Sequence, residues 1–249
     1  MALAMIRIYA AGISEGIAEV QHFEAQLPFA AALALTWTAK DVEAALIGEM
    51  RSVFDRPTRW TLNSLRVFPA TKDRLEARVW MKNEADKSVS ATRWMEPEIY
   101  GGTRQNKRSE AMLKARGILP EGKYIVPGQG AELDQYGNIK RGYLTKMLSG
   151  VGAYTQQGYN ANATSSTRSQ RRGNAKRFFV MHDARRNPIG IAERTGRGAD
   201  NLRIVLAFVS RPSYRKAFDF YGIADRVANE RLPLNYTKAI AQAVRTRRR

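Results

Sequence analysis

The spacing of apolar residues predicts one long amphipathic helix early in the chain. Between Leu27 and Phe54, apolar residues recur at steps of three and four, so that they share one side of a helix. These residues are Leu35, Ala39, Val42, Leu46, Met50 and Val53. Pro28 suits the first turn, and Asp55-Arg56-Pro57 ends the helix because proline cannot continue it.

Around this helix the pattern changes to short strands. Residues 65–68 and 75–81 predict two strands, which a turn at 69–73 joins as a hairpin. A strand at Ile6–Ala11 and a short helix from Ser14 to Ala25 precede the long helix. In the second half, three strands of a meander are predicted at Phe178–His182, Gly190–Arg194 and Leu202–Val209.

The C-terminal part of the chain predicts two helices. The first begins near Pro212 and places three aromatic residues on one face, which are Tyr214, Phe218 and Tyr221. The second begins near Pro233 and runs into an arginine-rich end. Both helices are expected to pack against the sheet.

This order of elements favours an α+β fold, in which an antiparallel sheet packs with a long N-terminal helix and C-terminal helices. The regular alternation of strand and helix that builds a parallel sheet is missing. Residues 83–177 contain only short predicted helices, at 108–116 and 141–148, between turns and loops. We therefore expect a single domain over residues 1–249 that carries a loop-rich insertion at about 83–177.

Charge and composition narrow the class of protein. The chain has 41 Lys and Arg against 23 Asp and Glu, a formal net charge of +18, which favours nucleic acid or acidic proteins as partners. Apolar residues make up 44%, as in a folded protein, and cysteine is absent, which excludes disulfides and thiolate chemistry. No apolar run predicts a membrane span, and the start of the chain does not have the pattern of a signal peptide.

Two basic segments are the candidate contact sites. A loop at 156–177, rich in Gln, Asn, Ser and Gly, has five cations and no acid: Arg168, Arg171, Arg172, Lys176 and Arg177. Such cations are either solvated or paired with an external anion, which is DNA phosphate or an acidic neighbouring subunit. The second segment holds Arg245, Arg247, Arg248 and Arg249, whose charges also complement the dipole at a helix C-terminus.

Catalytic chemistry has little support in the sequence. The two histidines, His22 and His182, have no nucleophile motif near them, and we interpret both as surface residues. No histidine, cysteine or carboxylate cluster has the spacing of a metal site, so no metal and no cofactor is expected. Gly196-Arg197-Gly198 lacks the pattern of a phosphate-binding loop and predicts a hairpin turn.

The two ends of the chain resemble a known family. Tyr214–Phe218, then Asn229–Pro233 and the basic helix to Arg249, resemble the end of minor tail protein Z of lambda-like bacteriophages. The alanine-rich helix at Phe29–Phe54, with the following Pro57-Thr58 and the strand pair ending at Ala77-Arg78-Val79, resembles the N-terminal half of that protein. Its family comprises tail-completion or neck proteins of tailed phages. The segment from Trp94 to Tyr159 is longer than the family pattern requires.

The resemblance implies a structural protein without catalytic residues. Such a protein assembles as a ring of identical copies at the head–tail junction or tail end, around the channel that DNA crosses. Its expected partners are copies of itself, other phage neck or tail proteins and the packaged DNA nearby, with no membrane. It is expected in the virion, which is assembled in the cytoplasm of the bacterial host.

Two rival functions remain open at this point. One is a non-enzymatic, basic nucleic-acid-binding protein that acts outside a virion, although no helix-turn-helix, zinc-finger or RNA-binding signature is present. The other is a nuclease, using carboxylates on or beside the predicted strands, which are Asp183, Glu193 and Asp200. We expect no enzyme, because these carboxylates form no recognisable catalytic pattern.

Overall fold

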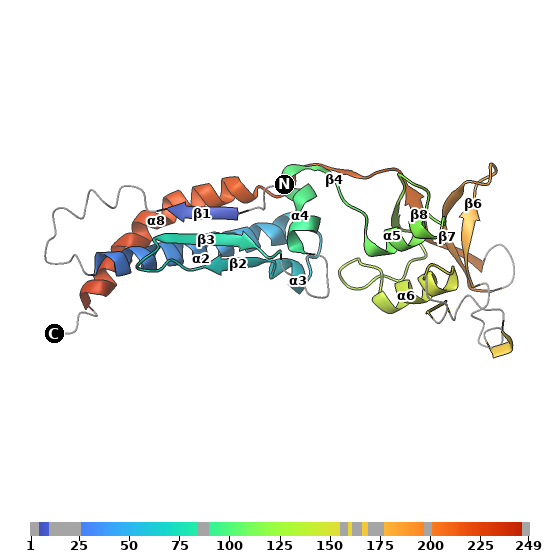
Figure 1. The fold of residues 1–249 in the computed structure, drawn as a ribbon, viewed down its shortest axis with the longest axis horizontal. Helices are drawn as coiled ribbons and strands as arrows, with labels where there is room; N and C mark the ends of the chain where they lie inside the picture. Colours follow the sequence, from blue (N-terminus) through green and yellow to red (C-terminus); the bar gives the residue numbers. More distant parts are fainter. Residues whose placement is uncertain are drawn as a thin grey trace. The chain divides into compact units, whose positions relative to one another are not determined.

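The computed structural model describes residues 5–9, 26–83, 90–154, 159–160, 166–168, 177–196 and 201–245. They form two compact units, which are drawn in Figure 1. Unit 1 comprises Met1–Gly102 and Tyr214–Arg249, and unit 2 comprises Thr103–Ser213. The predicted α+β fold, with a long N-terminal helix, antiparallel sheets and a C-terminal helix, is confirmed.

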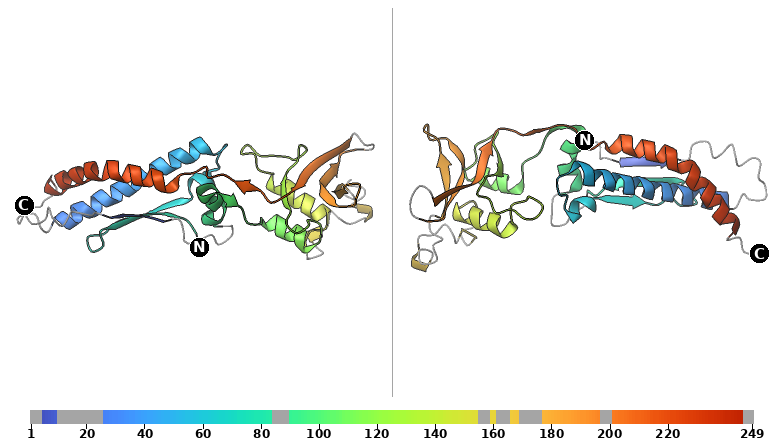
Figure 2. Two further views of the ribbon diagram at one scale, coloured as in Figure 1. Left: turned by 90° about the horizontal axis from the view of Figure 1, so that it is seen from above. Right: turned by 180° about the vertical axis from the view of Figure 1, so that it is seen from behind.

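Unit 1 is built on two long helices and a three-stranded sheet. Helix α2 spans Leu27–Val53 and helix α8 spans Phe220–Arg245. The antiparallel sheet has the order β1-β3-β2, and its strands are β1 (Met5–Tyr9), β3 (Glu76–Met81) and β2 (Leu65–Phe68). Figure 2 shows both long helices on one side of this sheet. Two shorter helices, α3 (Arg59–Leu62) and α4 (Ala91–Tyr100), complete the unit.

The core of unit 1 lies between α2, the sheet and α8. The predicted apolar stripe of α2 is buried, and Leu35, Val42 and Leu46 are fully inaccessible. They contact the inward-facing side chains of β3, which are Ala77, Val79 and Met81. At the other end of α2, small side chains allow close packing against α8; these are Ala30, Ala34, Ala239 and Ala243. The long helix predicted from the sequence therefore forms because its stripe has a partner on both sides.

The C-terminal part differs from the prediction of two helices. Tyr214 lies in the short strand β9 (Ser213–Tyr214), and a single helix α8 runs through Pro233. A proline inside a helix costs about 3 kcal/mol, since it removes one backbone hydrogen bond. Burial before Pro233, at Phe220, and after it, at Ala239, holds both halves against α2 and outweighs this cost.

Unit 2 has its own sheet and core. Its antiparallel sheet has the order β5-β8-β7-β6, formed by β5 (Tyr124–Pro127), β8 (Leu202–Val209), β7 (Pro188–Arg194) and β6 (Phe178–His182). The predicted meander is thus present. Helices α5 (Arg108–Ala115) and α6 (Arg141–Gly150) supply the other half of the core. Its buried residues include Leu113, Met147, Ile191, Leu206 and Phe208.

The single domain with a loop-rich insertion at 83–177 differs from what the structure contains. The inserted part is Thr103–Ser213, and it includes the meander, which lies beyond the insertion predicted at 83–177. The chain passes from unit 1 to unit 2 within β4 (Gly102–Thr103) and returns within β9, and these two short strands pair with each other. Within the stretch predicted to be loop-rich, residues Ala91–Tyr100 form helix α4. The short helix predicted at Ser14–Ala25 lies outside the described residues.

Candidate functional site

The sheet of unit 1 turns one face towards α2, and no helix among the described residues covers its other face. In β3, the side chains alternate: Ala77, Val79 and Met81 are buried, whereas Glu76, Arg78 and Trp80 are half-buried. Successive side chains of a strand point to opposite faces of the sheet. The half-buried set therefore lies on the face away from the core.

Strand register extends this outer face across the whole sheet. Phe68 stands opposite Arg78, Arg66 stands opposite Trp80, and Arg7 of β1 stands opposite Arg78. Residues directly opposite each other in an antiparallel pair share a face. We call this surface the arginine–aromatic face, and its members are Arg7, Arg66, Phe68, Glu76, Arg78 and Trp80.

Aromatic rings hold the guanidinium groups of this face in place. The guanidinium carbon of Arg66 lies 4.9 Å from the centre of the Phe68 ring, and that of Arg78 lies 5.2 Å from it. Trp80 meets Phe68 edge to face, with ring centres 6.5 Å apart and planes at 80°. Guanidinium groups at such positions gain cation–π attraction. The guanidinium groups of Arg66 and Arg78 are therefore already ordered, so a partner that binds them pays little further side-chain entropy.

One carboxylate balances only part of this positive charge. Glu76 lies 2.9 Å from Arg74, 3.5 Å from Arg7 and 3.6 Å from Arg78. The hydrogen bond from Arg74, followed by the charges of these arginines, lowers the pKa of Glu76, which is therefore ionised at neutral pH. Arg66 makes no ion pair with any described residue. The face keeps a net positive charge.

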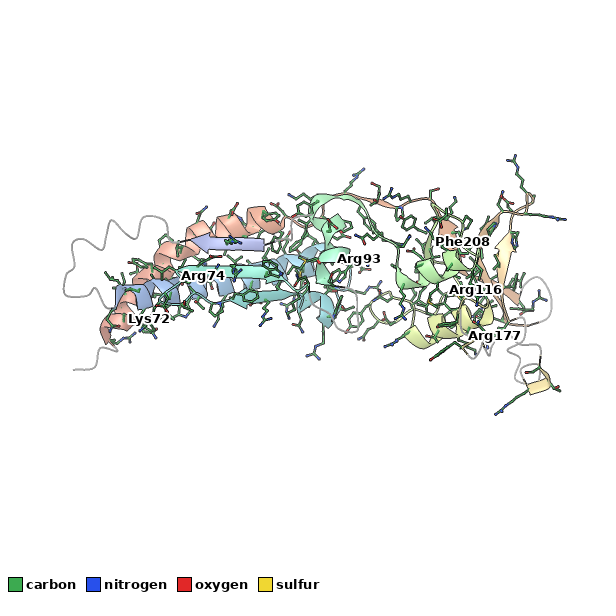
Figure 3. The ribbon with its side chains drawn as sticks, viewed as in Figure 1. Lys72, Arg74, Arg93, Arg116, Arg177 and Phe208 are labelled. Carbon is green, nitrogen blue, oxygen red and sulfur yellow. The ribbon has the colours of Figure 1, made fainter. Side chains whose placement is uncertain are left out.

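An open hollow of about 710 Å³ lies over β2 and β3. Four members of the face line it, together with Lys82 and Glu43 of α2; these members are Arg66, Phe68, Arg78 and Trp80. Figure 3 shows Lys72 and Arg74, which lie in the turn between these strands and add to the positive charge at that end of the sheet. This surface was not predicted from the sequence. Its signal is the alternation within 65–68 and 76–81, because the residues between the inward-facing apolar ones lie on the outer face.

The structure places three of the cations predicted from the sequence. Arg168 is exposed, and Arg245 is exposed at the end of α8. Arg177, which is labelled in Figure 3, donates from its Nε to Oε1 of Glu193 at 2.5 Å. Six further predicted residues lie outside the described residues, namely Arg171, Arg172, Lys176, Arg247, Arg248 and Arg249.

Arg177 departs from the expectation that the cations of the basic loop are either solvated or paired with an external anion, because its partner is an acid of the same chain. Its partner Glu193 is only 3% exposed and lies in β7, opposite Phe178 of β6. The sequence showed no acid within the loop, but the pairing of β6 with β7 brings this one from outside it. Contact of the other loop and terminal cations with DNA or an acidic partner stays a prediction.

Two of the three carboxylates considered for a nuclease, Glu193 and Asp183, have structural partners. Glu193 also accepts a hydrogen bond of 2.6 Å from the hydroxyl of Tyr143. Burial, together with this hydrogen bond, raises the pKa of Tyr143, so the phenol remains protonated. Asp183 accepts hydrogen bonds from the backbone N–H groups of Arg185, at 2.9 Å, and Asn187, at 2.8 Å, and so closes the turn between β6 and β7.

The remaining chemistry of the candidate residues is limited. Asp200 and His22 lie outside the described residues, and His182 is exposed at the end of β6. Among the described residues, no three side chains of the ligand type gather to hold a metal ion. In the same part of the chain, no helix combines the length and apolarity that crossing a bilayer requires.

Comparison with known proteins leaves the function to be argued from these residues. No family model matches the chain. The same is true of curated proteins and of solved structures, none of which matches.

Proposed function

We propose that this protein is a non-enzymatic structural component of a tailed-bacteriophage virion, a tail-completion or neck protein that assembles as a ring around the DNA channel. The observation that carries this proposal is the arginine–aromatic face, a preorganised surface without a covering element among the described residues. The resemblance of the two chain ends to the minor tail protein Z family gives the proposal its place in the particle.

The chemistry of the face suits a contact between subunits. Interface cores are enriched in aromatic side chains and arginine, and the residues that dominate binding are mostly Trp, Tyr and Arg. Trp80 and Phe68 offer rigid apolar area, while Arg66 offers a cation without an ion-pair partner among the described residues. A ring needs a contact between two different surfaces of identical subunits. The arginine–aromatic face is proposed as one of these two surfaces.

The charge of the other unit suits the DNA channel. Unit 2 has 20 Lys and Arg against 7 Asp and Glu, a formal net charge of +13, which leaves +5 for unit 1. A positive surface of this density attracts a polyanion, and the attraction weakens as salt is raised. Unit 1 is therefore proposed to make the assembly contacts and unit 2 to lie near DNA.

The oligomeric state of the purified full chain tests the proposal. Light scattering after gel filtration and negative-stain micrographs should show closed rings of one size. Trp80→Ala and Arg66→Glu should shift the protein towards monomers. Arg66 is exposed, so Arg66→Glu should leave the fold intact. This variant keeps the test valid if Trp80→Ala fails to fold. The matched control is Trp60→Ala, which removes an exposed tryptophan of α3 outside the face.

Two results would overturn the proposal. One is a protein that stays monomeric at every concentration and is absent from purified particles when these are probed with an antibody against it. The other is turnover of DNA by the purified chain in Mg²⁺ or Mn²⁺. A monomer that binds DNA strongly and with sequence selectivity would favour the second candidate, a basic nucleic-acid-binding protein outside a virion, which the charge of unit 2 also fits.

A further inference from the structure

A groove of about 890 Å³ crosses the surface of unit 2 between α5 and α6. Its floor is apolar and includes Met112 of α5 and Leu144 of α6. Its lining also carries two arginines, two hydroxyl-bearing residues and two tyrosines, and none of the described lining residues is a carboxylate. This size is within the range of ligand-binding clefts.

Two arginines mark the groove as a site for an anion. Arg108 is the first residue of α5, and Arg141 is the first residue of α6. Both are exposed, and neither makes an ion pair within the described part of the chain. The N–H groups and dipole at the start of each helix add partial positive charge beside these guanidinium groups.

A hydroxyl group in the lining is available to a ligand. Ser109 follows Arg108 at the start of α5, and the residue lines the groove. Its Oγ makes no hydrogen bond with any described residue and is not among the buried unpaired polar atoms, so it remains accessible. It can donate a hydrogen bond to an acceptor oxygen of a ligand in the groove.

Two stacked tyrosines form the far wall of the groove. The ring centres of Tyr154 and Tyr159 lie 5.8 Å apart, with planes inclined by 32°. The amide group of Asn160 fixes this arrangement, since it accepts from the backbone N–H of Tyr154 at 3.1 Å and donates to its carbonyl at 2.7 Å. Tyr159 is 64% exposed, so one face of its ring is available for stacking.

We infer that this groove binds a short unpaired segment of nucleic acid. Phosphate groups lie against Arg108 and Arg141, and a base stacks on Tyr159. Sites for single strands combine a positive groove with aromatic stacking platforms in this way. A duplex does not fit the role of Tyr159, because each of its bases is already stacked on both faces. An acidic peptide uses the two arginines but has no need of the exposed ring.

Fluorescence anisotropy of a fluorescein-labelled oligothymidine of twelve nucleotides, titrated with the full chain, tests this inference. Removal of one stacked base costs about 1–3 kcal/mol, so Tyr159→Ala should weaken binding roughly 5- to 150-fold. Tyr159→Phe, which keeps the ring, should bind like the parent protein. Arg108→Ala with Arg141→Ala should reduce the slope of log Kd against log salt by about 1.4, since each lost single-strand phosphate contact removes about 0.7.

The matched control removes the same charge elsewhere in unit 2. Arg185→Ala with Arg203→Ala replaces two exposed arginines of the β6–β7 turn and β8, and should change the affinity far less than the groove pair. Equal losses in the two pairs would mean diffuse attraction and would overturn the site. A second result would also overturn the site: the groove variants bind oligothymidine with unchanged affinity but no longer assemble into particles. The groove would then be a protein-docking site. Ring formation, measured in the same variants, should persist, so failure here is distinguishable from failure of the proposed function.

Discussion

Replacement of Glu110 should destabilise unit 2 selectively. This carboxylate is fully buried in α5, and each of its oxygens accepts two hydrogen bonds. Arg104 donates to both oxygens, at 2.5 and 2.7 Å, and the backbone N–H groups of Lys107 and Ile125 donate at 2.6 and 2.8 Å. The carboxylate thus ties the start of α5 to strand β5, two elements that share the core of unit 2.

The size of the effect follows from what the substitution leaves behind. In Glu110→Ala, the guanidinium group of Arg104, whose side chain is 12% exposed, loses its counter-charge, and the buried N–H of Ile125 loses its acceptor. Removal of one partner from a buried ion pair costs about 3–5 kcal/mol. Domains have a free energy of unfolding of about 5–15 kcal/mol, so much of the stability of unit 2 is lost. Glu110→Gln, which keeps one acceptor oxygen, should cost less.

The distribution of tryptophan allows the two units to be followed separately. All four tryptophans belong to unit 1, so their fluorescence reports the unfolding of that unit. Hydrogen exchange of the amides in α5 and β5 reports unit 2. In Glu110→Ala, exchange in these elements should accelerate by a factor of at least about 100, as expected for about 3 kcal/mol, while the urea midpoint by tryptophan fluorescence stays constant.

Two comparisons decide whether this reasoning holds. Glu121→Ala removes a carboxylate of the same unit whose side chain is 89% exposed and lies 3.6 Å from Lys114, and it should cost less than about 1 kcal/mol. The double variant Arg104→Ala with Glu110→Ala should be less destabilised than the sum of the two single variants. Equal effects of Glu110→Ala and Glu121→Ala, or simple additivity in the double variant, would refute the role of the buried pair.

Three further predictions concern pH and packing. Burial alone raises the pKa of Glu110, but Arg104 and the two N–H groups outweigh it and hold the pKa below its ordinary value. The stability that ionised Glu110 contributes is therefore fully present above a pH of about 4.3 and is lost as the pH falls through the lowered pKa. At acidic pH, the hydrogen-exchange rates of α5 and β5 in the parent protein and in Glu110→Gln should therefore become similar. The side-chain amide of Asn235 in α8 donates a hydrogen bond of 2.8 Å to the carboxylate of Asp41 in α2. Asn235→Ala should reduce the free energy of unfolding of unit 1 by about 1–3 kcal/mol, seen as a lower urea midpoint by tryptophan fluorescence. Gly190→Ala would place a Cβ 2.4 Å from the carbonyl oxygen of Leu206 and should cost at least about 1–3 kcal/mol, seen as faster exchange in β7 and β8 but not as a change in tryptophan fluorescence.

Local periodicity predicted most of the individual elements. The stripe from Leu35 to Val53 identified α2, because a helix that buries one side must repeat its apolar residues near every third or fourth position. The alternation in 76–81 identified β3 and, through the turn before it, its hairpin with β2. These features depend on neighbours in the chain. They are visible in the sequence because the physical constraint is local.

Pairings between distant segments could not be predicted in this way. From the sequence, Pro233 indicated a helix boundary. The contact of α8 with α2 keeps the helix continuous there, but it joins residues about 200 positions apart and leaves no local pattern. The same holds for Arg177 and Glu193, which meet only because β6 pairs with β7.

For the candidate surfaces, the excess of cations and the alternation within each strand can be read from the sequence. That Arg7, Arg66 and Arg78 share one face of a sheet depends on the fold, because the register of β1, β3 and β2 sets which side chains stand opposite one another. The fold also decides that most of the net charge belongs to a separate unit with its own core. Charge is a property of residues, whereas a binding surface is a property of the distances that burial of the core imposes on them.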